Sequence, residues 1–259
     1  MERIKIKNSK GQSIAAVVDY TAKPYNRLAI LCPGYLDTKD YAHLAALATR
    51  LTEKGYTVVR FDPTGTWESE GNISEYTTTQ YLADIEYVLD YMVKKDGYSY
   101  VLLGGHSRGG QVSILFAAGN PKINAVLGLM PSLGRVEKSE REEWKNVGVR
   151  ISKRDLPGDR TQTTEFKVPF SHRQDREQYD TLEAVKKIHA PIVLVAGELD
   201  DIVEPNEVKE IFDKANEPKR FVLIEGIGHD YRLNDTEIAK VNSRIIESLF
   251  PFILQTSRE

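Results

Sequence analysis

The chain has 259 residues, close to the upper size of a single α/β domain. Hydrophobic residues make up 41% and charged residues 28% of it, a composition that excludes a disordered chain, a collagen and a disulfide scaffold. The net charge of −3 and the single cysteine, Cys32, exclude a basic nucleic-acid groove, an internal disulfide and a multi-thiolate metal site. The sequence shows neither a signal-peptide pattern nor an apolar run of about 18 residues, so we expect a cytoplasmic protein that does not bind a membrane.

Short apolar runs alternate with helical patterns along most of the chain. Strands are predicted at 4–6, 13–19, 28–31, 57–61, 100–103, 125–130, 192–195 and 221–224, and helices at 41–54, 81–95, 111–118 and 207–215. Continuous apolar runs indicate strands that are covered on both faces. The pattern therefore predicts an α/β fold with a mostly parallel, doubly wound sheet of about eight strands. In such sheets the functional residues lie just after the strands, at their carboxyl ends.

The segment 131–176 breaks this alternation. It begins with a strongly charged stretch and continues to Pro157-Gly158, where a hairpin turn is possible. We interpret 131–176 as a small cap inserted over the strand ends, because long segments of this kind in compact domains are often lids. The alternative is a long solvated surface loop. Residues 1–130 and 177–259 are then expected to form the core domain.

A candidate nucleophile follows the expected strand 100–103. The residues Gly105-His106-Ser107-Arg108-Gly109 form a G-x-S-x-G pattern between a predicted strand and a predicted helix. A serine hydroxyl stands free there only on a sharp turn, and the glycines avoid collisions with the neighbouring strand and helix. The alternative is a glycine-rich turn that only packs a strand against a helix.

A serine nucleophile requires a base that takes its proton and a carboxylate that orients the base. His229 follows the strand predicted at 221–224 and lies in a glycine-containing loop, which suits the base. Asp200 is our choice for the acid, although Asp201 and Glu198 in the same loop are also candidates. The remaining histidines are expected to be structural: His43 on a helix face, His106 packed beside the serine, His172 at the surface of the cap and His189 at a turn.

With the order Ser…Asp…His, the sequence resembles the serine hydrolases of the α/β-hydrolase fold, and the resemblance covers nearly all of the chain outside the insertion. The loop 62–71 also resembles a structural loop of that family. The resemblance implies an oxyanion hole made by the backbone N–H groups of Tyr35 and Arg108, with Pro33 where the family usually has histidine. It implies neither a cofactor nor a metal.

The insertion is similar to the small caps of cinnamoyl and feruloyl esterases, on the residues Val168-Pro169-Phe170 and Tyr179-Asp180. This resemblance implies a pocket for an aryl acyl group. Aromatic residues that could form its wall, together with Tyr35, are Trp67, Trp144, Phe170 and Tyr231.

The side chain of Arg108 is unusual, because a cation in the first turn opposes the helix dipole. We expect a carboxylate partner for it on the loop 62–70; the alternative is a contact with an acidic group of the substrate.

The sequence thus predicts a serine carboxylesterase that hydrolyses small acyl or aryl esters, of the cinnamoyl or feruloyl kind, through an acyl-enzyme on Ser107. Its partner is a small-molecule ester, and the oligomeric state is not specified by the sequence. Two alternatives stay open. One is a peptidase or amidase of the same fold, and the other is a catalytically silent binding protein that keeps the fold.

Overall fold

The computed structural model describes residues 1–22 and 26–256, so residues 23–25 and 257–259 of the predicted core domain lie outside the described residues. In chain order its strands and helices are β1 (Glu2–Lys7), β2 (Ser13–Asp19), β3 (Arg27–Cys32), α1 (Ala42–Glu53), β4 (Tyr56–Phe61), η1 (Ile73–Glu75), α2 (Thr78–Asp96), β5 (Tyr100–His106), α3 (Arg108–Ala117), β6 (Ala125–Leu129), α4 (Lys138–Val147), β7 (Val149–Leu156), β8 (Asp159–Pro169), α5 (Ser171–Arg176), α6 (Thr181–Val185), β9 (Ile192–Gly197), α7 (Pro205–Lys214), β10 (Lys219–Ile224), η2 (Tyr231–Leu233) and α8 (Asp235–Thr256).

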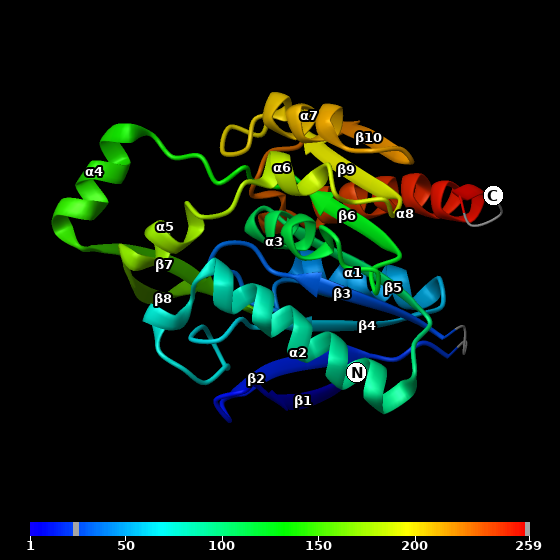
Figure 1. Ribbon diagram of the computed structural model, residues 1–259, viewed down its shortest axis with the longest axis horizontal. Coiled ribbons are helices and arrows are strands. Elements are labelled where there is room, and N and C mark those ends of the chain that lie inside the picture. Colours follow the sequence, from blue (N-terminus) through cyan, green and yellow to red (C-terminus); the bar gives the residue numbers. More distant parts are fainter. Residues whose placement is uncertain (23–25, 257–259) are drawn as a thin grey trace.

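The central sheet has eight strands in the order β1-β2-β4-β3-β5-β6-β9-β10 (Figure 1). In this sheet β4, β3, β5, β6, β9 and β10 are parallel, whereas β2 pairs antiparallel with both β1 and β4. This confirms the predicted α/β fold with its mostly parallel, doubly wound sheet. The carboxyl ends of β3, β5, β6, β9 and β10 consequently meet at one edge of the sheet, where the functional residues were expected.

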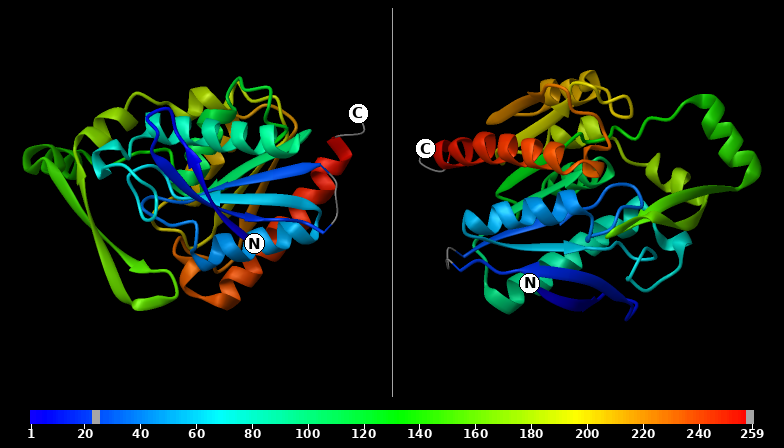
Figure 2. Two further views of the ribbon diagram at one scale, coloured as in Figure 1. Left: turned by 90° about the horizontal axis from the view of Figure 1, so that it is seen from below. Right: turned by 180° about the vertical axis from the view of Figure 1, so that it is seen from behind.

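Helices cover both faces of this sheet, which explains the unbroken apolar runs of the central strands. Helices α1 and α8 pack together on one face, and α2, α3, α6 and α7 lie on the other (Figure 2). Side chains of each central strand alternate between the two resulting cores: Leu28 and Ile30 enter one, and Ala29 and Leu31 enter the other. The strands are thereby held rigidly, and so are the loops at their ends.

The helix α2 shows how local signals set the length of one element. Its N-cap Thr77 accepts a hydrogen bond from the Gln80 N–H, and Gly97 ends it in the left-handed conformation, with φ of 67°. Its apolar face, including Ile85 and Leu89, is buried against the sheet. The long helix α8 was not among the predicted elements, although its acidic first turn suits a helix N-terminus.

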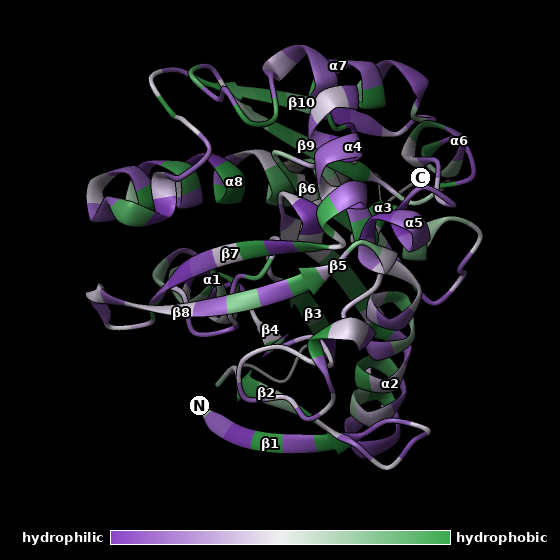
Figure 3. Cartoon of the chain, turned by 90° about the vertical axis from the view of Figure 1, so that its left-hand side faces the viewer, coloured by the Kyte–Doolittle hydropathy of each residue, from purple (hydrophilic) through white to green (hydrophobic). Residues whose placement is uncertain are grey.

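The segment 131–176 contains α4, the antiparallel hairpin β7–β8 and α5, and it projects beyond the strand ends (Figure 1). The hairpin turns at Pro157-Gly158, as the sequence suggested. Helix α4 is largely hydrophilic (Figure 3), and Trp144 is its buried residue. The division into a core and a cap with boundaries at 131 and 176 stays a prediction.

Asp155 is one of the residues that join the hairpin to the core. Asp155 in β7 receives two hydrogen bonds from the guanidinium of Arg232, at 2.8 and 2.9 Å. The Tyr41 hydroxyl, at the start of α1, donates to the backbone oxygen of Asp155 at 2.8 Å. Asp155 therefore ties the turn end of the hairpin to the start of α1 and to η2.

Candidate active site

Ser107 occupies the sharp turn between β5 and α3. Its φ of 54° and ψ of −117° are strained for a residue with a side chain, and its N–H is held by the backbone oxygen of Leu129, at 2.8 Å. A Cβ atom on Gly105 or Gly109 would lie 2.4 or 2.0 Å from the backbone oxygen of Cys32, so both positions require glycine. The motif thus has the geometry for which its residue types were singled out.

Cys32 itself is buried in the core, and burial raises the pKa of its thiol to about 12. A thiol in this state is not ionised near neutral pH and offers no second nucleophile.

The structure brings His229 and Asp200 to Ser107 from two other strand ends. The Nε2 atom of His229 lies 2.9 Å from the Ser107 Oγ, and its Nδ1 atom lies 2.7 Å from the Asp200 Oδ2. Because a carboxylate only accepts hydrogen bonds, Nδ1 carries the proton and Nε2 is left as an acceptor for the serine hydroxyl. This arrangement lets the imidazole take the serine proton.

Asp200 is oriented by its own loop. Its Oδ1 atom accepts from the N–H groups of Ile202 and Val203, at 3.0 and 2.8 Å, and its side chain is fully buried. Of the two other candidates, Asp201 is exposed, and Glu198 accepts from the Gly226 N–H at 2.8 Å. The loop geometry therefore selects Asp200 as the partner of His229.

The predicted oxyanion donors lie on either side of the serine. The N–H of Arg108 is the first of helix α3, and the first N–H groups of a helix have no partner within the helix. The peptides on either side of the Tyr35 N–H are held: the Tyr81 hydroxyl donates to the Pro33 oxygen at 2.9 Å, and Arg154 of the cap donates to the Tyr35 oxygen at 2.7 Å. No hydrogen bond from the Tyr35 N–H is seen within the part of the chain that the structure describes. Both N–H groups stay available to an oxyanion.

The expected carboxylate partner of Arg108 was wrong. The guanidinium donates to the His172 Nε2 at 3.0 Å and to the Thr78 Oγ1 at 3.4 Å, and it lies 4.9 Å from the centre of the Tyr76 ring. The loop 62–70 makes other contacts: the Asp62 carboxylate is 2.8 Å from the buried ammonium of Lys39. The cap helix α5 brings in the imidazole from a distant part of the chain, which no local pattern reveals.

His172 was expected at the surface of the cap, and this expectation was wrong, because the structure buries it. Burial, and then the nearby Arg108, lower the pKa of His172 to about 2, so that it is neutral and accepts from the arginine. Its Nδ1 atom donates to the backbone oxygen of Tyr76 at 2.5 Å.

The aromatic residues do not form one continuous wall. Trp144 stacks on His172 and touches the Phe170 ring edge-on, while Tyr35 meets the His172 ring from another side. Trp67 contacts Tyr41 and Phe166 instead. Tyr231 is 1% exposed and packs against His43 and His106 beneath the site. A substrate contact for Trp67, Phe170, Trp144 or Tyr231 stays a prediction.

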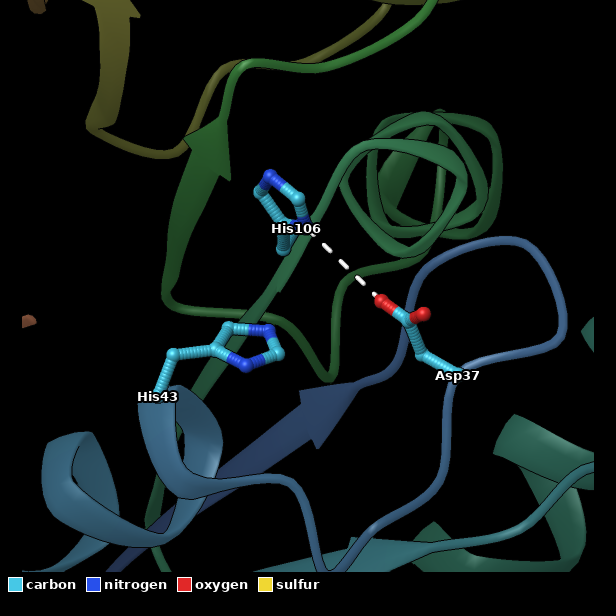
Figure 4. A group of neighbouring side chains, drawn as sticks. All are labelled: Asp37, His43 and His106. Atoms are coloured by element: carbon cyan, nitrogen blue, oxygen red, sulfur yellow. Dashed lines mark ion pairs between the residues drawn. The ribbon is translucent and has the colours of Figure 1, made fainter. Parts of the chain in front are cut away.

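A second histidine–aspartate group, which the sequence reasoning missed, lies next to the triad. Asp37, His43 and His106 are buried and their side chains converge (Figure 4). The His106 ring lies 4.7 Å from the ring of His229, yet its Nδ1 atom is 3.9 Å from the Asp37 Oδ2, beyond hydrogen-bonding distance. Burial lowers the pKa of His43 to about 3 and also lowers that of His106, so both rings are neutral.

Asp37, His43 and His106 are also, among the residues that the structure describes, a group close enough to share a metal ion, with ligand atoms within 4.8 Å of one another. The Arg154 Nε atom lies 3.8 Å from the other oxygen of the Asp37 carboxylate. A guanidinium beside the only anionic ligand disfavours a further cation there. We therefore interpret Asp37, His43 and His106 as side chains that pack beneath His229, and not as a metal site.

Known proteins resemble this chain in sequence and in fold. A model of the serine aminopeptidase S33 family matches residues 24–187, a range that includes Ser107. The mouse (Mus musculus) palmitoyl-protein thioesterase ABHD10, mitochondrial, is 25% identical over 220 residues, which are 80% of this chain and 69% of the mouse protein.

Two solved structures have the same fold. The ferulic acid complex of Est1E from Butyrivibrio proteoclasticus superposes with a TM-score of 0.78 at 22% identity, over 97% of this chain and 99% of the other. The mouse alpha/beta hydrolase domain-containing protein 10 has a TM-score of 0.75 at 20% identity, over 95% and 98% of the two chains.

The sheet order, the serine on its turn and these likenesses define a hydrolase of the α/β-hydrolase fold. The chain belongs to the serine aminopeptidase S33 family, whose model covers more than half of it, and the curated proteins that it resembles include a thioesterase. The described helices include none that is both long and apolar enough to cross a membrane.

Proposed function

We propose that this protein is a serine carboxylesterase that hydrolyses small acyl or aryl esters, with Ser107 as nucleophile, His229 as base and Asp200 as its orienting acid. One observation carries the proposal: the Ser107 Oγ, the His229 imidazole and the Asp200 carboxylate form a continuous hydrogen-bonded chain, at 2.9 and 2.7 Å. The nucleophile at the end of this chain is followed directly by the Arg108 N–H, the first of helix α3.

In the first step, the Ser107 Oγ attacks the ester carbonyl while its proton passes to the His229 Nε2. The carbonyl oxygen becomes an oxyanion, which the N–H groups of Tyr35 and Arg108 stabilise; one such donor typically contributes about 3 kcal/mol to the transition state. The tetrahedral intermediate then collapses, and His229 returns the proton to the departing alcohol. Asp200 stabilises the imidazolium throughout, as a buried carboxylate 2.7 Å from Nδ1.

In the second step, water attacks the acyl group on Ser107. His229 takes a proton from that water and the second tetrahedral intermediate expels the serine oxygen, which regains the proton. The products are a carboxylic acid and a free enzyme. No group outside the chain and water is needed for either step.

The aryl or small acyl preference is supported by the cap and by the relatives. Aromatic side chains of the cap and core, among them Tyr35 and Phe170, gather near His172. Est1E is a neighbour in fold whose structure holds ferulic acid, and the mouse relative is by its name a thioesterase. A thioester presents the same carbonyl to Ser107 and belongs to the same test.

A peptidase is the second candidate, because the matching family model is described by an aminopeptidase. An aminopeptidase must bind the charged amine of its substrate, for which a carboxylate is the natural partner. The residue that follows the nucleophile is instead Arg108, a cation whose hydrogen-bond partners are His172 and Thr78, and this favours the esterase.

The test is a set of initial rates on p-nitrophenyl esters from acetate to decanoate, methyl ferulate, an S-acyl thioester and an amino-acid anilide, with the Ser107→Ala variant beside each. Ester or thioester turnover that disappears in the variant supports the proposal. Cleavage of the anilide alone would move the protein to the peptidases. If neither the substrates nor a serine-reactive phosphonate gives a signal, the silent-binder alternative holds. A cytoplasmic location and the absence of nucleic-acid and membrane partners stay predictions.

A further inference from the structure

Two arginines next to the nucleophile have no carboxylate partner. Arg108 follows Ser107 directly and is 1% exposed. Arg176 ends helix α5 of the cap and is partly buried. Among the described residues neither guanidinium lies within ion-pairing distance of a carboxylate, although the chain carries many acidic residues.

The guanidinium of Arg108 has neutral neighbours. It donates to the His172 Nε2 and the Thr78 Oγ1, and it lies over the Tyr76 ring. Its Nε atom is buried and makes no hydrogen bond, and the Tyr35 hydroxyl is buried and unpartnered as well. The cation is thus held in place by groups that do not neutralise it.

The guanidinium of Arg176 is bound to the elements that carry Ser107. It donates to the Gln111 Oε1 at 2.9 Å and to the Ser132 Oγ at 3.0 Å. The N–H groups of Gln111 and Ser132 in turn donate to the Ser107 backbone oxygen, at 3.1 and 3.2 Å. A single residue, Gln111 or Ser132, therefore connects Arg176 to the backbone of the nucleophile.

The carboxylates of this region are engaged elsewhere. Asp175 accepts from the Thr78 and Thr79 N–H groups at the start of α2, at 2.6 and 3.0 Å. Glu177 is bound by Arg141 and Arg173 on the outer side of α5. Asp37 lies beside Arg154. None of these carboxylates neutralises Arg108 or Arg176.

A buried cation such as Arg108, with a second unpaired cation on the facing cap helix, is costly unless an anion joins them. Burial, and then the charges of Arg108 and Arg173, lower the pKa of Arg176 to about 9. Guanidinium groups are suited to bidentate binding of carboxylate oxygens. A ligand that brought one carboxylate here would relieve the repulsion and satisfy unused N–H groups.

We propose that Arg108 and Arg176 form an anion subsite, and that the natural substrate is an ester or thioester carrying a carboxylate a few bonds from its scissile carbonyl. This rests on the proposed function and names the substrate class for the same site. The carboxylate could belong to the acyl part or to the alcohol part, and the subsite takes the same chemistry from either.

The experiment compares matched esters. Methyl hydrogen adipate and methyl hexanoate have acyl chains of equal length with and without a carboxylate, and 3-acetoxypropanoate and propyl acetate do the same for the alcohol part. In the native enzyme we expect kcat/KM for one anionic ester to exceed that of its neutral partner about 10- to 100-fold, the value of one or two charge-assisted hydrogen bonds. The pair that shows the preference tells which part carries the charge.

Variants assign the preference to the subsite. Arg176→Gln should reduce the ratio of anionic to neutral kcat/KM about 10-fold or more, and Arg176→Lys should restore much of it. Arg173→Gln is the matched control, since Arg173 lies on the same helix but is paired with Glu177, and it should leave the ratio as in the native enzyme. A native ratio near one, or equal ratios in the native and Arg176→Gln enzymes, would overturn the subsite.

A binding measurement separates this proposal from the esterase proposal. Adipate, added to the Ser107→Ala protein, should raise its Tm, and this rise should be lost when Arg176→Gln is added. If neutral esters are hydrolysed but neither adipate binding nor anionic preference appears, the subsite is wrong and the esterase stands. If adipate binds but no ester is cleaved, the esterase is wrong and the anion site stands.

Discussion

Two histidine–aspartate groups lie side by side in this protein, and only one is arranged for catalysis. His229 is 2.7 Å from Asp200 and reaches Ser107 with its other nitrogen, and its side chain is 10% exposed. His106 is 3.9 Å from Asp37, and neither of its ring nitrogens has a hydrogen-bond partner. The two imidazole rings are 4.7 Å apart.

The difference comes from where the protein places each ring. His229 lies on a loop after β10 that the glycine at 228 leaves open, so the ring turns toward Ser107. His106 is the last residue of β5, and its side chain points into the core beneath His229, against Tyr231 and His43. Burial keeps His106 neutral, so it supports the catalytic ring by packing. Residue type alone does not make a catalytic pair; a proton path to the nucleophile does.

The largest effect is expected for Ser107→Ala, which removes the end of the catalytic chain. Loss of a triad serine typically lowers kcat by about 10⁶. The measurement is the rate on the best ester of the panel, with circular dichroism to show that the variant is folded. A rate within 100-fold of the native enzyme would mean that the nucleophile lies elsewhere.

The next effect separates the two aspartates. Asp200→Asn should lower kcat by about 10⁴, because an amide partner favours the wrong imidazole tautomer. The matched change Asp37→Asn touches the neighbouring group and should lower kcat less than about 10-fold. Steady-state kinetics of both variants under the same conditions make the comparison, which fails if the two losses are alike.

The buried histidines should make stability fall in mild acid. Burial lowers the pKa values of His43, His106 and His172 below the ordinary 6.5, to about 3 for His43 and about 2 for His172. The unfolded chain therefore binds more protons below about pH 6.5, and stability that is fully present above that pH is lost as the pH falls. Asp84, whose pKa burial raises to about 6, opposes part of this loss.

Between pH 6.5 and 5.5 we expect the free energy of unfolding to drop by about 2 kcal/mol. Urea unfolding at the two pH values measures it. A free energy that is flat or rises over this interval would show that these rings are charged in the folded protein.

The smallest effect is expected for His106→Phe. This change keeps the ring contacts with His229 and Tyr231 and removes two buried nitrogens that have no partner. We expect kcat to change less than about threefold and the acid loss of stability to become smaller, because one buried histidine with a lowered pKa is removed. A loss of kcat comparable to that of Asp200→Asn would instead make His106 part of the proton path.

Much of the fold and the centre of the site was predictable because the signals are local. A buried strand is recognised in the sequence as an apolar run. Such runs alternate with helical patterns because helices have to cover both faces of the sheet. The nucleophile turn is equally local, since Gly105 and Gly109 have to make room for the Cys32 backbone. The same holds for His229 and Asp200, which lie just after their strands.

What stayed ambiguous or was wrong depends on contacts between distant segments. The choice among Glu198, Asp200 and Asp201 required the turn of the loop, which buries one carboxylate and leaves another exposed. The partner of Arg108 is His172, which follows it by 64 residues and lies on a cap helix. No rule of sequence spacing connects the two residues. The aromatic wall was expected from residue type alone. In the folded protein, Trp144 packs against His172, whereas Trp67 and Tyr231 pack against other residues.

The sequence by itself therefore determined the α/β class and predicted Ser107 as nucleophile and His229 as base, because each follows from a pattern a few residues long. For the acid it offered three candidate carboxylates. Tertiary structure decided which charges are compensated. The free energy of a buried cation depends on every group packed around it, and here those groups come from α2, α3 and the cap. Only their assembly shows that, among the described residues, Arg108 and Arg176 have no carboxylate partner.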